Sequence, residues 1–243
     1  AKLPKQITIA NNATDANNDI DFSAGNFQFD DGTGIASLSA IIKRLDAAWA
    51  AGTNQGGLDT GAEANSTWYH CFAIYNPTTL VSDALFSLSA TSPTMPSGYT
   101  KKRRVGSVYN NSSGNILAFN QFGQYFFHNS PIVDRSLSVA PTTATNLTLS
   151  TPVNTIAIFN AHLHENTGGG TRYVLICPST SSNLVASSTN YTAYISTPGG
   201  SQQSNTTGNL FVKTNASSQV VLDADSTGVS VEILTFGWID YQL

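Results

Sequence analysis

The chain has 243 residues, of which 40% are hydrophobic and only 11% are charged, and its formal net charge is −4. This length is sufficient for one large β domain or two smaller ones, and the 12 Phe, 9 Tyr and 3 Trp residues exclude a disordered chain. The small negative charge argues against sequence-independent binding to nucleic acid, which requires a basic face. We therefore expect no nucleic-acid partner.

No run of about 18 apolar residues is present, and the first residues, AKLPKQITIANNATDANND, lack the apolar run of a signal peptide. We expect no insertion into a membrane. Cys71 and Cys177 each lie in an apolar, strand-like run, HCFAIY and YVLICP, which favours two buried free thiols over one disulfide. Asn-x-Ser/Thr triplets, as at Asn65 and Asn146, are expected by chance in a chain this rich in Asn, Ser and Thr.

The N-terminal stretch up to Gly34 predicts two short strands, ITIA and FQF, separated by turns rich in Asn and Asp. One amphipathic helix is then predicted over residues 38–51, between Ser37 and a C-terminal Gly52. Its apolar face is formed by residues at helical spacing, namely Leu38, Ile41, Ile42, Leu45, Ala48 and Trp49. Its solvent face is formed by charged residues, namely Lys43, Arg44 and Asp46.

From Thr67 onward, apolar runs typical of strands alternate with turn formers, as in WYHCFAIY, DALFSLSA and NILAFNQF. A change in proline spacing and polar content at Pro131 indicates a domain boundary. Seven further strand-like runs follow it, enough for a complete sandwich. The sequence therefore predicts an all-β protein with an antiparallel β-sandwich or jelly-roll-like fold and one short helix in the N-terminal half. The expected domains are a β-rich region 1–130 and a sandwich 131–243.

His162 and His164 alternate along one predicted strand, which places both imidazoles on one sheet face, with Glu165 next in sequence. A zinc site normally needs a third protein ligand, which could only come from distant His70, His128 or an acid. A polar outer face near a loop explains the pair more simply. We predict no metal site and no cofactor.

Two acidic pairs, Asp30 with Asp31 and Asp223 with Asp225, suggest calcium ligands or glycosidase carboxylates. The D-A-D spacing lacks the further oxygen ligands and the glycine of an EF-hand loop, and a glycosidase pair depends on the fold, so turn roles are expected. The glycines at 168–170 lead into the strand-like RYVLIC, which argues against a phosphate-binding loop. No nucleophile motif of a serine or cysteine hydrolase is present, and we predict no catalytic residue.

One strongly basic run, KKRR at 101–104, stands out in this nearly neutral chain. It could bind a carboxylate, a phosphate or an acidic sugar, although positive charge that protects an edge strand explains it equally well. Tyrosines in Ser/Thr/Asn-rich loops could stack on sugar rings, close turns or pack between subunits. The candidate glycan or partner contacts are Tyr99, Lys101, Lys102 and Tyr191.

Four segments, LDAAWAAGTNQGGLDTG, STWYH, ALFSLSATSPTMPSGYTKKRRVGSV and LTFGWIDYQL, occur in this order in one chain. Together they resemble a group of phage and prophage virion-associated proteins found beside or at the ends of tail fibres. The resemblance covers about Ile7 to Tyr241 and supplies no catalytic residues.

This resemblance implies a non-enzymatic structural protein of the virion, made in the cytoplasm of the host bacterium. Its expected partners are other virion proteins and a host surface glycan, with residues 1–130 as the part that docks on the particle. A homotrimer is expected because trimerisation hides sheet edges. Three alternatives remain open: a capsid decoration or head-fibre protein, a polysaccharide-degrading enzyme, and a lectin unrelated to any virion.

Overall fold

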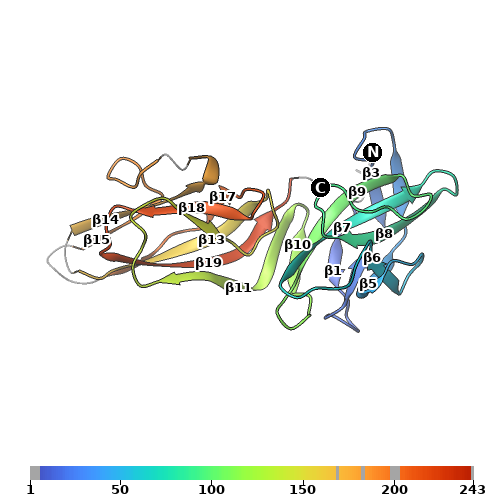
Figure 1. The fold of residues 1–243 in the computed structure, drawn as a ribbon, viewed down its shortest axis with the longest axis horizontal. Helices are drawn as coiled ribbons and strands as arrows, with labels where there is room; N and C mark the ends of the chain where they lie inside the picture. The colour runs from blue at the N-terminus through green and yellow to red at the C-terminus, as the bar shows by residue number, and fades with distance from the viewer. Residues whose placement is uncertain (1–5, 168–169, 182–183, 198–202, 242–243) are drawn as a thin grey trace. The chain divides into compact units, whose positions relative to one another are not determined.

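The computed structural model describes residues 6–167, 170–181, 184–197 and 203–241. The chain divides into two compact units, one formed by Ala1–Asn129 with Asp240–Leu243 and the other by Ser130–Ile239 (Figure 1). Nearly all regular structure is β, which confirms the all-β prediction, and a β-sandwich-like class fits. The only helical element in the described residues is the short 3-10 turn η1 (Ser179–Ser181), and no helix there is long and apolar enough to cross a membrane.

The first unit is built on a seven-stranded mixed sheet. Its order is β1 (Ile9–Asn11), β2 (Asp19–Phe22), β5 (Ile41–Ala48), β6 (Gln55–Leu58), β8 (Val81–Ser87), β7 (Thr67–Asn76) and β9 (Lys101–Asn110). The pairs β5–β6 and β6–β8 are parallel, so the prediction of a purely antiparallel arrangement is wrong for this unit. A separate hairpin joins β3 (Gly25–Gln28) to β4 (Ile35–Leu38), and β10 (Phe119–Phe122) pairs with the start of β11 (Tyr125–Leu137).

The helix predicted over residues 38–51 is wrong, because this segment forms the end of β4 and the whole of β5. Ile41 and Leu45, two of the residues that suggested a helical face, also fit a two-residue period. Lys43 and Leu45 are buried on one face of β5, while Arg44 and Asp46 are exposed on the other. β5 pairs with β2 on one side and with β6 on the other, and this pairing provides hydrogen-bond partners for its backbone. The tertiary context therefore favours a strand over a helix in this segment.

Lys43, expected in solvent, is completely buried and forms an ion pair of 3.2 Å with Asp83, which is 2% exposed. Its ammonium group also donates to the carbonyl oxygens of Ala50 and Gly52, at 2.7 and 3.2 Å. Asp83 accepts in turn from the Gly52 amide at 2.8 Å. Burial lowers the pKa of Lys43, while Asp83 opposes this shift. This network fixes the loop that connects β5 to β6.

Removing one member of a buried ion pair leaves the other charge without compensation. We expect Lys43→Ala to lower the free energy of unfolding by about 3–5 kcal/mol. The adjacent Arg44→Ala is the matched control, because the Arg44–Asp46 pair is exposed and should contribute less than about 1 kcal/mol. Urea denaturation of both variants measures the difference, and equal losses would contradict this role of Lys43.

The second unit is a sandwich of two sheets. One contains β11, β19 (Val229–Ile239), β13 (Ile156–Glu165) and β16 (Ser204–Thr206), with β17 (Leu210–Lys213) also pairing with β13. The other has the order β12 (Thr145–Thr148), β18 (Gln219–Ala224), β14 (Gly170–Pro178) and β15 (Ala193–Thr197). In this unit the pairs β12–β18, β13–β16, β13–β17, β13–β19, β14–β15 and β14–β18 are all antiparallel. The finer prediction of a jelly-roll-like strand order stays a prediction.

One hydrophobic cluster fills the space between these two sheets. Alternate residues of β13 contribute to this cluster, and two of them, Ala161 and Leu163, are completely buried. Val174 and Ile176 of β14 and Val231 and Ile233 of β19 belong to the same cluster. The residues between them on each strand must therefore point to the two outer faces of the sandwich.

Pro131, at which a domain boundary was predicted, lies inside β11, which is one continuous strand from Tyr125 to Leu137. The two compact units divide within this same strand, between Asn129 and Ser130. Both cysteines, Cys71 and Cys177, are buried and free, as predicted.

His70 is a buried histidine of β7, 3% exposed, whose Nδ1 lies 2.8 Å from the Ser107 hydroxyl. Burial, with a smaller contribution from the positive charge of Arg104, lowers the pKa of His70 from 6.5 to about 3. Arg104 itself is buried and paired with Asp240 at 2.5 Å. The imidazole is therefore neutral at pH 7 in the folded protein.

This depressed pKa makes stability depend on pH. Between pH 6.5 and about 3 the unfolded chain binds a proton at His70 that the folded chain does not. The free energy of unfolding should therefore fall as the pH is lowered through this window, by up to about 1.4 kcal/mol per pH unit for this group. Urea denaturation from pH 7 to pH 4 measures the slope. We expect a shallower slope for His70→Gln than for the wild type, and an unchanged slope would contradict the assignment.

Candidate functional site

The basic run at the start of β9 is already paired within the protein. Lys101 donates to Asp31 and Lys102 to Asp30, each over 2.6 Å, and Arg103 lies 3.7 Å from Asp30. These contacts tie the β3–β4 turn to β9, and hydrogen bonding to Lys101 and Thr33 lowers the pKa of Asp31. A glycan contact at Lys101 or Lys102 would thus compete with existing carboxylate partners.

Tyr99 is not the exposed aromatic that its loop sequence suggested. Its side chain is 9% exposed and lies in a hydrophobic cluster with Phe72, Ile74 and Leu85. Its ring meets that of Trp49 edge to face, with 5.4 Å between the centroids. Gly98, at a φ of +82°, turns the chain so that Tyr99 points inward. The expectation that Tyr99 can stack on a sugar is therefore wrong.

Tyr191, in contrast, is 44% exposed and belongs to a group of three tyrosines in the second unit. Its ring centroid lies 5.1 Å from that of Tyr173 and 5.6 Å from that of Tyr194, which is 48% exposed. The rings of Tyr173 and Tyr194 are 6.4 Å apart. We call Tyr173, Tyr191 and Tyr194 the tyrosine cluster.

The fold positions these rings through strand alternation. Tyr173 precedes the core residue Val174 in β14, and Tyr194 lies between the buried Ala193 and Ile195 in β15. Tyr173 and Tyr194 are direct cross-strand partners, so both rings stand on the outer face of this sheet. Sequence reasoning missed them because the pairing of β14 with β15 sets their proximity.

Tyr191 reaches the cluster from the loop before β15, and hydrogen bonds hold that loop in place. Thr192 both accepts from the Ile176 amide and donates to the Ile176 carbonyl, at 2.9 and 2.8 Å. The Asn190 side-chain amide donates to the Val185 carbonyl at 2.8 Å. The aromatic surface is therefore ordered before any ligand arrives, which reduces the entropic cost of binding.

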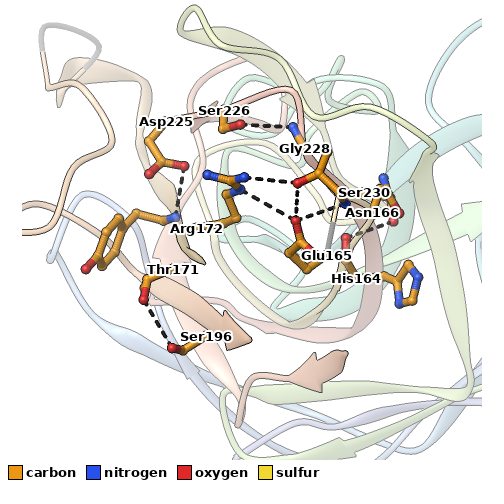
Figure 2. Close-up of polar contacts among 12 residues, drawn as sticks. His164, Glu165, Asn166, Thr171, Arg172, Ser196, Asp225, Ser226, Gly228 and Ser230 are labelled. Carbon is orange, nitrogen blue, oxygen red and sulfur yellow. Dashed lines mark hydrogen bonds and ion pairs between the residues drawn. The ribbon is translucent and has the colours of Figure 1, made fainter. Parts of the chain in front are cut away.

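Polar groups flank the tyrosine cluster. Asp225 accepts from the backbone amide of Tyr173 at 3.0 Å, and the hydroxyls of Thr171 and Ser196 lie 3.1 Å apart (Figure 2). The Asn205 side-chain amide donates to the Tyr194 carbonyl at 3.1 Å. Aromatic rings beside hydroxyl, amide and carboxylate groups are the combination that sugars require, since a sugar ring has both an apolar face and hydroxyls.

Glu165 lies on the opposite side of its strand from the neighbouring histidines. It is completely buried, and Arg172 of the facing sheet approaches its carboxylate to 3.7 Å (Figure 2). Thr167 donates its amide to the same carboxylate oxygen at 2.9 Å and accepts from Arg172 at 3.0 Å. These contacts link the two sheets at one end of the sandwich core. Glu165 therefore has a structural partner and does not join His162 and His164.

His162 and His164 lie on the outer face of β13, as their alternation predicts. Glu232 and Ser230 of β19 are their direct cross-strand partners. His70 and His128, the other candidate ligands, are buried in the first unit. Within the described residues, no group of three His, Cys, Asp or Glu side chains could hold a metal ion.

The acidic pairs have local roles. Asp30, Asp31 and Asp225 lie outside strands, as expected of turn residues. Asp223 differs, because it is a buried residue of β18 and accepts from the Ala186 amide at 2.8 Å. Of the three glycines at 168–170, the first two lie outside the described residues, and Gly170 begins β14.

No protein-family model, curated protein or solved structure matches this chain.

Truncation of the two tyrosines predicted as contacts should lower the free energy of unfolding by very different amounts. Tyr99→Ala removes a core aromatic, and we expect it to lower the free energy of unfolding by about 3 kcal/mol or more. Tyr191→Ala removes a half-exposed ring and should cost about 1 kcal/mol or less. Chemical denaturation followed by circular dichroism measures both. A large loss at Tyr191 would show that the tyrosine cluster serves the fold.

Proposed function

We propose that this chain is a non-enzymatic structural protein of a phage particle, a tail-fibre or tail-associated module that attaches to a host surface glycan. The single observation that carries attachment is the tyrosine cluster, an ordered and exposed aromatic surface with polar groups at its margin. The resemblance of four ordered sequence segments to virion-associated proteins supports the phage context. On this proposal the protein is made in the host cytoplasm and resides in the virion.

The first unit is the proposed docking part. Its β10–β11 hairpin carries the exposed aromatics Phe122 and Tyr125, which are 67% and 46% exposed, and the rings of Phe122 and Phe127 are 6.4 Å apart. The hairpin sequence FNQFGQYFFH contains no Asp, Glu, Lys or Arg. An exposed aromatic surface without these charges suits a contact with another virion protein or another copy of this chain. A capsid decoration or head-fibre protein would use the same docking and is the nearest alternative.

The non-enzymatic part of the proposal is supported by the pairing of the candidate charged residues. Asp30, Asp31, Asp223 and Asp225 have the structural partners described above, and Glu165 lies with Arg172 in the core. A glycosidase instead needs two carboxyl groups that flank the bond to be cleaved.

Glycan binding is tested by titrating the full chain with surface polysaccharide from a susceptible host. We expect the double variant Tyr191→Ala/Tyr194→Ala to weaken binding about tenfold or more, because each aromatic contact is worth about 0.5–1.5 kcal/mol. Tyr241→Ala, which truncates an exposed tyrosine of the first unit outside the β10–β11 hairpin, is the matched control and should bind like the wild type. Equal affinity of all three proteins would overturn the assignment to the tyrosine cluster, and shortened polysaccharide after incubation would overturn the non-enzymatic claim.

The location in the virion and the homotrimer are tested by two separate measurements. Mass spectrometry of purified particles should detect the chain, whereas its absence would favour a free lectin. Light scattering at micromolar concentration should give about three times the monomer mass of 25.7 kDa. A mass equal to the monomer would contradict the homotrimer.

A further inference from the structure

The outer face of the β11–β19–β13–β16 sheet contains a polar hollow of about 330 Å³ that glycan binding by the tyrosine cluster does not use. It lies on the opposite outer face of the same sandwich from the tyrosine cluster. Its lining consists mainly of imidazole, carboxylate and hydroxyl side chains. The lining residues are Ser136, Leu137, Ser138, His162, His164, Ser204, Ser230, Val231 and Glu232.

Strand register brings the polar groups together from three strands. Because Ala161 and Leu163 of β13 face the core, His162 and His164 must face outward. Glu232 of β19 lies directly opposite His162. Ser204 of β16 lies directly opposite His164 on the other side of β13. The hollow is therefore part of a paired sheet surface, with its central groups on hydrogen-bonded strands.

One histidine is held in orientation. The Nδ1 atom of His164 lies 2.7 Å from the Ser204 hydroxyl, so the second ring nitrogen is left for another partner. Figure 2 shows the His164 imidazole turned away from the Glu165 carboxylate. In the part of the chain that the structure describes, His162 and Glu232 have no side-chain hydrogen bond or ion pair, so both can still bind a ligand.

The chemistry of this lining matches a sugar ring. A volume of about 330 Å³ is at the lower end of the range for small-molecule sites, about 300–1,000 Å³. The carboxylate of Glu232 can accept from two sugar hydroxyls, and imidazole and serine groups can both donate and accept. Glu232 is the only Asp, Glu, Lys or Arg residue in the described lining, so the hollow disfavours a negatively charged ligand.

We propose that the hollow formed by His162, His164, Ser204 and Glu232 binds a single neutral or amino sugar residue and rejects acidic sugars. This site is independent of the tyrosine cluster and goes beyond the proposed attachment function. A metal ion is not its occupant, because no suitable group of three ligands is present in the described residues.

The test is an NMR titration of the full chain with three separate probes: galactose, glucosamine and galacturonic acid. We expect galactose or glucosamine to shift the imidazole signals of His162 and His164, and galacturonic acid to leave them unchanged. Glu232→Gln keeps the shape of the side chain but removes its charge, and it should weaken binding of the active probe about tenfold or more. Ser204→Ala should weaken binding as well, because His164 loses the partner that orients it.

The variant Tyr191→Ala/Tyr194→Ala separates this site from the tyrosine cluster, because it should bind the probes in the hollow like the wild type. Three results would overturn the proposal: no shift of the two imidazole signals at millimolar sugar, equal binding of galacturonic acid, or unchanged affinity in Glu232→Gln. If the hollow fails while the tyrosines still bind host polysaccharide, the proposed function stands without it. If polysaccharide binding fails while the hollow binds sugar, the proposed attachment to a host glycan is lost and the site in the hollow stands.

Discussion

The second unit depends on one constraint, which is the burial of alternate side chains of β13 and β14 in a core shared by two sheets. Leu163 and Val174 are both completely buried in that core. Because successive side chains of a strand point to opposite faces, burying these residues forces His162 and His164 outward on one sheet and Tyr173 outward on the other. Both candidate sites are thus consequences of how the core is packed.

Pairing of buried charges complements this apolar packing. Lys43 with Asp83 and Arg104 with Asp240 are nearly inaccessible pairs in the first unit. A buried pair with good geometry adds little net stability compared with apolar residues, but loss of one partner is costly, so such pairs constrain the sequence strongly. The chain has few charges, and two acidic and two basic side chains are used in these buried pairs. Aromatic, imidazole and hydroxyl groups therefore make up most of the two candidate sites.

The β-rich class was predictable from the sequence, because apolar runs between turn formers dominate the chain after Thr67. The helix error at residues 38–51 arose because Ile41 and Leu45, four positions apart, fit both a helical and an alternating pattern. Counting Lys43 as a solvent residue favoured the helix, since its partner Asp83 lies 40 positions away in the sequence. Local periodicity contains no information about such a distant partner.

The sites show the same division between local and tertiary information. The shared face of His162 and His164 follows from their spacing alone, whereas their neighbours Glu232 and Ser204 follow from pairing with β19 and β16. Tyr99 and Tyr191 look alike in sequence. Only tertiary packing distinguishes them, because Tyr99 is buried in a cluster with Phe72, Leu85 and Trp49.

The placement of the two proposed sites limits how a glycan can engage them. They lie on opposite outer faces of one sandwich, so a short stretch of one glycan chain cannot occupy both. Separate chains, or separate branches of one polymer, would fill them, and the gain from linking the two sites depends on how densely those chains are presented. A trimer would triple the number of sites. Weak individual sites of this kind are useful to an attachment protein on a crowded surface, where avidity supplies the strength that a single sugar contact lacks.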